Sequence, residues 1–141
     1  MTELKRTFDS VADLYEAARP AYPPELFADL VALARLELGA RLLEIGCGTG
    51  KATRVLLDRG YSIVCVELGA QLAERARREL AGRRVEIHVA PFEEWPAERG
   101  TFALVYAATA WHWLDPELRY RRAHELLREG GRLAFWSATH A

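Results

Sequence analysis

Leu42-Leu43-Glu44-Ile45-Gly46-Cys47-Gly48-Thr49-Gly50 carries the strongest structural signal in the chain. Its first half continues from Arg41 as a largely apolar run, which predicts a short strand ending at Ile45. Three glycines at alternate positions follow the strand. A glycine-rich turn between a strand and the next helix lets the backbone approach a ligand closely and directs helix amides towards it. The stretch therefore predicts a strand–turn–helix unit with a ligand-binding turn.

Strands and helices alternate along the rest of the chain. The predicted strands are 41–45, 63–66, 85–89, 102–107 and 132–136. The predicted helices are 11–18, 24–39, 51–59, 71–81 and 116–128, the last with Asp115 as its N-cap. In the segment from Pro24 to Gly39, a helical period joins Leu26, Leu30, Leu33 and Glu37, and the apolar stripe is widened by Phe27, Val31 and Ala34. Strands that alternate with helices over a short chain predict βαβ units. We therefore expect an α/β fold with a parallel sheet and helices on both faces.

Composition and charge limit the classes of function. The chain has 141 residues, which is enough for one domain with a single core. Its formal net charge of −1 disfavours a nucleic-acid partner, which usually requires a basic face. The longest nearly apolar run, Phe102–Trp111, is about half of a membrane span. Cys47 and Cys65 lack a metal-ligand spacing, which predicts reduced, packed thiols and no metal site. We expect one cytoplasmic domain that does not bind membranes.

The spacing of the glycines distinguishes between kinds of ligand. Dinucleotide sites favour G-x-G-x-x-G, whereas the glycines here alternate over residues 46–50. A loop that binds nucleotide phosphates would end in G-K-[ST], but Lys51 is followed by Ala52. Glu44-x-Gly46-x-Gly48-x-Gly50 instead resembles the first signature of class I S-adenosylmethionine-dependent methyltransferases. A nicotinamide-dependent oxidoreductase is therefore disfavoured.

This resemblance implies a fold and a cofactor. The fold is a Rossmann-like doubly wound sheet with five strands in the order 3-2-1-4-5, without the two further strands that such enzymes usually carry. The cofactor is S-adenosylmethionine, held at the turn formed by Gly46, Cys47, Gly48 and Gly50. The sulfonium of this cofactor already carries an activated methyl group, so the protein must mainly align the acceptor and exclude water.

Two acids extend the resemblance. Glu67 ends the second predicted strand, 21 residues after Gly46, where an acid in the family accepts hydrogen bonds from both ribose hydroxyls. Leu68 would then pack on the adenine, and Glu44 would lie near the methionine end of the cofactor. Other interpretations stay open at this point. Glu67 is also consistent with a carboxylate favoured by the dipole of the next helix, and Glu44 with a charge that faces solvent at a strand end.

The segment after the third predicted strand is the expected adenine side of the site. Many relatives carry an aspartate there that binds the adenine amino group, but this chain has Pro91 at the aligned position. Phe92 and Glu93 could still frame the adenine, through a backbone amide and a side chain. The alternatives are that Phe92 is a core residue and Glu93 a solvated loop acid.

The run Ala107–Pro116 resembles a small-molecule branch of the family that includes the trans-aconitate methyltransferase-like and methyltransferase domain 11 groups. The resemblance implies that this stretch, including Ala108, lies along the cofactor and opens towards the acceptor. His112 could act as a general base there. It could equally be a packed, hydrogen-bonded histidine that fixes the loop.

The N-terminal segment resembles the same branch over Phe8–Pro23. The resemblance implies that Tyr15 and Arg19 form a lid, with the guanidinium facing the carboxylate of the cofactor. The alternative for Arg19 is a surface cation beside a turn. The single domain, 1–141, would thus consist of a lid segment at 1–23 and a Rossmann-like core at 24–141.

The sequence therefore predicts a methyltransferase that acts on a small-molecule acceptor, as a truncated form of a longer enzyme. The alternative is a non-catalytic module that binds S-adenosylmethionine or contributes an interface, completed by a partner or a second copy. The apolar run Gly131–Trp136 would form an unprotected sheet edge, through which a homodimer could assemble.

Overall fold

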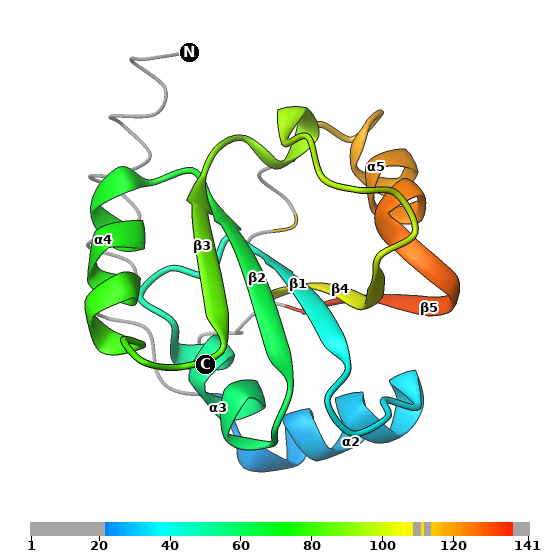
Figure 1. Ribbon diagram of the computed structural model, residues 1–141. Helices are drawn as coiled ribbons and strands as arrows, with labels where there is room; N and C mark the ends of the chain where they lie inside the picture. The colour runs from blue at the N-terminus through cyan, green and yellow to red at the C-terminus, as the bar shows by residue number, and fades with distance from the viewer. Residues whose placement is uncertain (1–21, 109–110, 112–113, 137–141) are drawn as a thin grey trace, which may run out of the picture.

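The computed structural model describes residues 22–108, 111 and 114–136 (Figure 1). Five strands form one parallel sheet in the order β3-β2-β1-β4-β5, which confirms the predicted topology. The strands are β1 (Arg41–Ile45), β2 (Ser62–Glu67), β3 (Val85–Val89), β4 (Phe102–Ala108) and β5 (Leu127–Trp136). The helices are α2 (Pro24–Ala34), α3 (Lys51–Asp58), α4 (Ala70–Glu79) and α5 (Arg119–Leu126), with a 3₁₀ turn, η1 (Phe92–Glu94). The predicted helix 11–18 lies outside the described residues.

The helices cover both faces of the sheet. Residues of α2, α3 and α4 form one hydrophobic cluster with the strand side chains that include Leu42. Residues of η1 and α5 form a second cluster on the opposite face, with Leu43. Both leucines are fully buried, as expected for a central parallel strand that is covered on two sides. In Figure 1, α3 and α4 lie away from α5, on the other side of the strands.

Helix α2 is shorter than predicted, and one of the side chains assigned to its apolar stripe faces solvent. It ends at Ala34 because Arg35 adopts a left-handed conformation (φ 52°) and its N–H bonds back to the helix, so the predicted end at Gly39 is wrong. Leu33, assigned to the apolar stripe, is 78% exposed. The side chains that face the sheet are Phe27, Leu30 and Ala34, with Val31 partly buried beside them.

Helix α5 is shorter at both ends than the predicted segment 116–128. Asp115 does not cap the helix: its side chain accepts the N–H of Glu117 at 2.8 Å within a turn that precedes α5. The helix ends at Leu126, whose carbonyl accepts the N–H of Thr101 at 2.9 Å from the start of β4. Strand β5 begins at the next residue, earlier than predicted, so a tertiary hydrogen bond sets this boundary.

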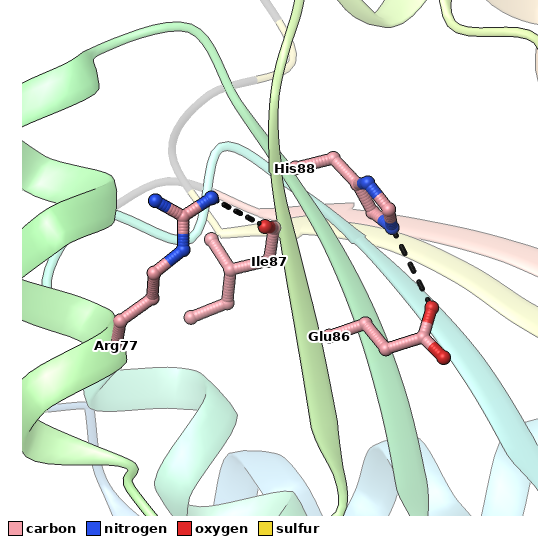
Figure 2. Close-up of polar contacts among 4 residues, drawn as sticks. All are labelled: Arg77, Glu86, Ile87 and His88. Atoms are coloured by element: carbon pink, nitrogen blue, oxygen red, sulfur yellow. Dashed lines mark hydrogen bonds and ion pairs between the residues drawn. The ribbon is translucent and has the colours of Figure 1, made fainter.

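Strand β3 is one edge of the sheet, and polar side chains occupy it. Figure 2 shows Arg77 of α4 donating a hydrogen bond to the carbonyl oxygen of Ile87, at 2.8 Å. His88 and Glu86 on the same strand lie 3.5 Å apart, Nε2 to Oε2. Such contacts are one way in which proteins make an edge strand less available for pairing. Of the helices that the structure describes, none is sufficiently long and apolar to cross a bilayer.

Candidate functional site

The glycine-rich turn lies at the carboxyl ends of β1 and β2. The N–H of Gly46 donates to the carbonyl of Val66 at 2.8 Å, and the N–H of Gly50 donates to the carbonyl of Cys47 at 2.9 Å. Gly50 has a φ of +93°, and a Cβ atom there would lie 2.8 Å from a methyl carbon of Leu80. Position 50 therefore favours glycine for both its conformation and its space.

Glu67 ties this turn to the end of β2. One carboxylate oxygen accepts the N–H of Gly48 at 2.7 Å, and the other accepts the N–H of Gly69, also at 2.7 Å. The side chain is buried, with 1% exposure. Because Gly69 is the N-cap residue of α4, the open interpretation as a carboxylate at a helix N-terminus also describes this placement. The structure thus places Glu67 against the turn, and its predicted contact with the ribose of the cofactor stays a prediction.

Glu44 does not face solvent, so that alternative is wrong. The side chain is 1% exposed. Its Oε1 accepts two hydrogen bonds, from the hydroxyl of Thr53 at 2.6 Å and from the hydroxyl of Tyr106 at 2.7 Å. Three elements, β1, α3 and β4, therefore meet at one carboxylate oxygen directly beneath the turn.

Tyr106 is fixed from two directions. Its ring is fully buried and lies nearly parallel to that of Trp136 on β5, with an interplanar angle of 2° and centroids 5.9 Å apart. Burial, together with the charge of Glu44, raises the pKa of the Tyr106 hydroxyl well above 10.0. The hydroxyl therefore stays protonated and remains a hydrogen-bond donor to Glu44.

The thiols of Cys47 and Cys65 lie near the carboxylate of Glu44. Both are buried and neither forms a disulfide, as predicted. The thiol of Cys47 is 3.6 Å from the carbonyl oxygen of Gly48. A side-chain hydrogen bond with Cys65, followed by burial, raises the pKa of Cys47 well above 9.0. Burial likewise raises the pKa of Cys65. Both thiols are thus held in the neutral form, as packed residues rather than reactive ones.

The remaining predicted site residues fall into different surroundings. Leu68 is half-buried next to Glu67. Ala108 is buried at the end of β4, in register with Trp136. Phe92 is 2% exposed within the cluster under α5, as its core alternative predicted.

Glu93 makes a hydrogen bond that the sequence did not predict. Its Oε2 accepts the N–H of Asp115 at 2.9 Å. The side chain also lines a pocket of about 250 Å³ together with Leu118, Arg121, Arg122 and Glu125. Glu93 therefore connects the segment after β3 to the segment before α5.

Tyr15, Arg19 and His112 lie outside the described residues, so the lid and the general base stay predictions. Within the described part of the chain, no three potential metal-ligating side chains gather.

Sequence reasoning missed Thr53 and Tyr106. A signal existed for Tyr106, because a phenolic hydroxyl in the middle of an apolar strand needs a buried hydrogen-bond partner. Its partner lies 62 residues away and could not be identified from local pattern. For Thr53, a polar residue in the first turn of a helix is too common to stand out.

Residues 43–135 match the family model described as a methyltransferase domain. An uncharacterised methyltransferase of Mycobacterium tuberculosis is 34% identical over 131 residues, which are 93% of this chain and 51% of that protein. The malonyl-[acyl-carrier protein] O-methyltransferase of Geobacter sulfurreducens is 36% identical over 101 residues, 68% of this chain and 38% of that protein. The chain thus spans about half or less of the length of these relatives.

Among solved structures, the fold is similar to that of the Haemonchus contortus phosphoethanolamine N-methyltransferase 2 in complex with phosphomonomethylethanolamine and S-adenosylhomocysteine. The TM-score is 0.78 at 24% identity, over 92% of this chain and 33% of the other. At this identity, the likeness concerns the fold alone.

Proposed function

The chain belongs to the class I S-adenosylmethionine-dependent methyltransferase family, and from that premise we propose that it binds S-adenosylmethionine and transfers its methyl group to a small-molecule acceptor. The observation that supports this proposal best is the contact between Glu67 and the N–H of Gly48. It brings an acid at the end of β2 against the glycine-rich turn after β1. In parallel α/β sheets, ligands bind at this carboxyl edge of the strands.

The donor and acceptor groups at this edge fit the cofactor. A carboxylate oxygen can accept more than one hydrogen bond, so the bonds from Gly48 and Gly69 are compatible with further bonds from ribose hydroxyls to Glu67. Leu68 follows directly and offers an apolar side chain for the adenine. Glu44 supplies a negative charge below the turn for the methionine end. These residues, together with Gly46, Cys47 and Gly50 in the turn, form the proposed cofactor site.

The residues of this chain would mainly bind and orient. When bound, S-adenosylmethionine supplies an activated methyl group whose bond to sulfur breaks as a bond to the acceptor forms. Ala108 and the segment after β4 would align the acceptor with that methyl, which is catalysis by proximity and orientation. His112 would accept the proton that the acceptor releases. Tyr15 and Arg19 would cover the site and exclude water.

For the acceptor, we propose a small molecule, with a small acid as the first class to test. The name of the Geobacter relative, a malonyl-[acyl-carrier protein] O-methyltransferase, supports an acid whose oxygen is methylated. The net charge of −1 still disfavours a nucleic acid. A cytoplasmic location and a homodimer through β5 belong to the same proposal.

Support for the homodimer comes from the position of β5 at the end of the sheet, where Phe135 is 47% exposed. Light scattering coupled to size-exclusion chromatography tests it. A mass of two chains that falls to one when Phe135→Lys is introduced supports the homodimer. A single-chain mass at all concentrations overturns it.

Calorimetric titration of the chain with S-adenosylmethionine, S-adenosylhomocysteine and NAD tests the cofactor. Binding of the first two in the micromolar range, with no heat from NAD, is the expected result. Binding of NAD alone, or of none of the three, contradicts the proposal. If the cofactor binds but no methyl group reaches any acid of a panel in a radiolabel assay, the non-catalytic binding module becomes the better description.

A further inference from the structure

One oxygen of a buried carboxylate takes two short hydrogen bonds in this protein. The Oε1 of Glu44 accepts from the hydroxyl of Thr53 at 2.6 Å and from the hydroxyl of Tyr106 at 2.7 Å. Hydroxyl-to-carboxylate bonds of this length are among the strong ones in proteins. Because burying a charge is costly without such donors, the two hydroxyls stabilise a carboxylate at a place where the fold otherwise offers an apolar cluster.

The sheet itself brings the two groups together. Glu44 and Tyr106 are partners in the register between β1 and β4, so their side chains leave the sheet on the same face. Thr53 reaches the same point from α3, which packs on that face. The hydroxyl of Tyr106 cannot swing away easily, since its ring is fully buried and stacked on Trp136. The carboxylate is therefore held by groups that are themselves rigid.

The position of this carboxylate points to a role in binding. Glu44 lies two residues before Gly46, at the foot of the turn that forms the proposed cofactor site, and Thr53 is in the first turn of the helix that follows it. We propose that Tyr106 and Thr53 are positioning residues that hold the carboxylate of Glu44 towards the ammonium group of the cofactor's amino-acid portion. This inference rests on the proposed function. It adds that the affinity for that portion depends on two hydroxyls outside the glycine motif.

Three nucleoside probes separate this role from a structural one. S-adenosylmethionine and S-adenosylhomocysteine carry the amino-acid portion, whereas methylthioadenosine lacks it. We expect Tyr106→Phe and Thr53→Val each to raise the Kd of the first two probes about three- to tenfold, the scale of one ordinary hydrogen bond, because each variant keeps the carboxylate and one of its two hydroxyl donors. The Kd of methylthioadenosine should stay within about twofold, because it would not reach Glu44.

Thr53→Ser is the matched control, since it keeps the hydroxyl and removes only a methyl group. It should bind all three probes nearly as the parent does. Calorimetric titration at one pH gives all of these constants, and circular dichroism verifies that each variant is folded. If Tyr106→Phe does not fold, the comparison of Thr53→Val with Thr53→Ser decides the question alone.

The outcomes are distinct. A parent chain that binds none of the probes overturns the proposed function, and this inference with it. A parent chain that binds S-adenosylmethionine, with variants that lose affinity equally for all three probes, assigns the two hydroxyls to the stability of the site only and overturns the positioning role. Unchanged affinities in both variants overturn it as well.

Discussion

The carboxylate of Glu67 accepts the backbone N–H of Gly48 at 2.7 Å, although the two residues are 19 positions apart in the chain. The parallel pairing of β1 with β2, in which Ile45 lies opposite Val66, places the ends of the two strands side by side. The carboxylate of Glu67 and the glycine-rich turn are therefore structurally coupled. A substitution at Glu67 should disturb the turn, and a substitution in the turn should disturb Glu67.

Glu67→Gln should destabilise the fold. Both carboxylate oxygens accept backbone N–H groups, from Gly48 and Gly69, and an amide would direct its own NH₂ group at one of them. We expect the free energy of unfolding, measured by urea titration, to fall by about 1–3 kcal/mol. Glu86→Gln is the control, because the Glu86 side chain is 64% exposed. Equal stability of the Glu67 variant and the parent would contradict the described contacts.

Glu67→Ala should weaken the binding of S-adenosylmethionine. The variant loses the charge-assisted hydrogen bonds that the carboxylate would make to the ribose, and we expect a loss of about 1–3 kcal/mol in binding free energy. Calorimetric titration measures it, at a temperature where the variant is folded. If this variant binds the cofactor as tightly as the parent, the cofactor has been placed wrongly.

Gly50→Ala should cost more than Gly60→Ala. Both glycines have positive φ, +93° and +98°, so each substitution strains the backbone by about 1 kcal/mol or more. Position 60 has open space for a Cβ atom, whereas at position 50 that atom would lie 2.8 Å from Leu80, which would have to shift within the core. Urea titration of the two variants side by side gives the difference. Equal losses would mean that Leu80 moves at no cost.

The free energy of unfolding should decrease as the pH rises above about 9. The pKa values of Cys47 and Cys65 are raised above 9.0 in the folded chain, and that of Tyr106 is raised well above 10.0. As the pH rises, the unfolded chain therefore releases these protons before the folded chain does. Because the unfolded chain then binds fewer protons, raising the pH stabilises the unfolded state relative to the folded state. The stabilisation by the neutral groups is complete below the unfolded pKa values.

Tyr106→Phe isolates one of these groups. We expect it to remove up to about 1.4 kcal/mol per pH unit from the slope above pH 10, the effect of one proton. Tyr120→Phe is the control, because Tyr120 is half exposed. A slope unaffected by the Tyr106 substitution would show that this hydroxyl ionises equally in both states.

Local pattern was sufficient for the strands β1 to β4, whereas β5 begins at Leu127 and not at the predicted Arg132. β1 and β3 have their predicted bounds, and β2 ends at Glu67 as expected. For β2 the reason is that a strand covered on both faces is apolar over most of its length, and a single segment reveals this without its neighbours. The glycine-rich turn is equally local.

Helix ends were less predictable, because distant groups set them. The carbonyl of Leu126 accepts the N–H of Thr101, so α5 stops at Leu126 and not at its predicted end, residue 128. In α2, the helix packs on the sheet through Phe27, Leu30 and Ala34, so Leu33 lies on the side that faces solvent. Periodicity allowed more than one such stripe.

The chain order of residues was enough to predict the parallel sheet, the turn after β1 and the acid at the end of β2, since each depends on a few consecutive residues. The meeting of Glu44 with Tyr106 and Thr53, and of Glu93 with Asp115, depends on folding. Strand order and register bring together side chains that are far apart in sequence, and a buried polar group takes whichever partner the packing places within hydrogen-bond distance.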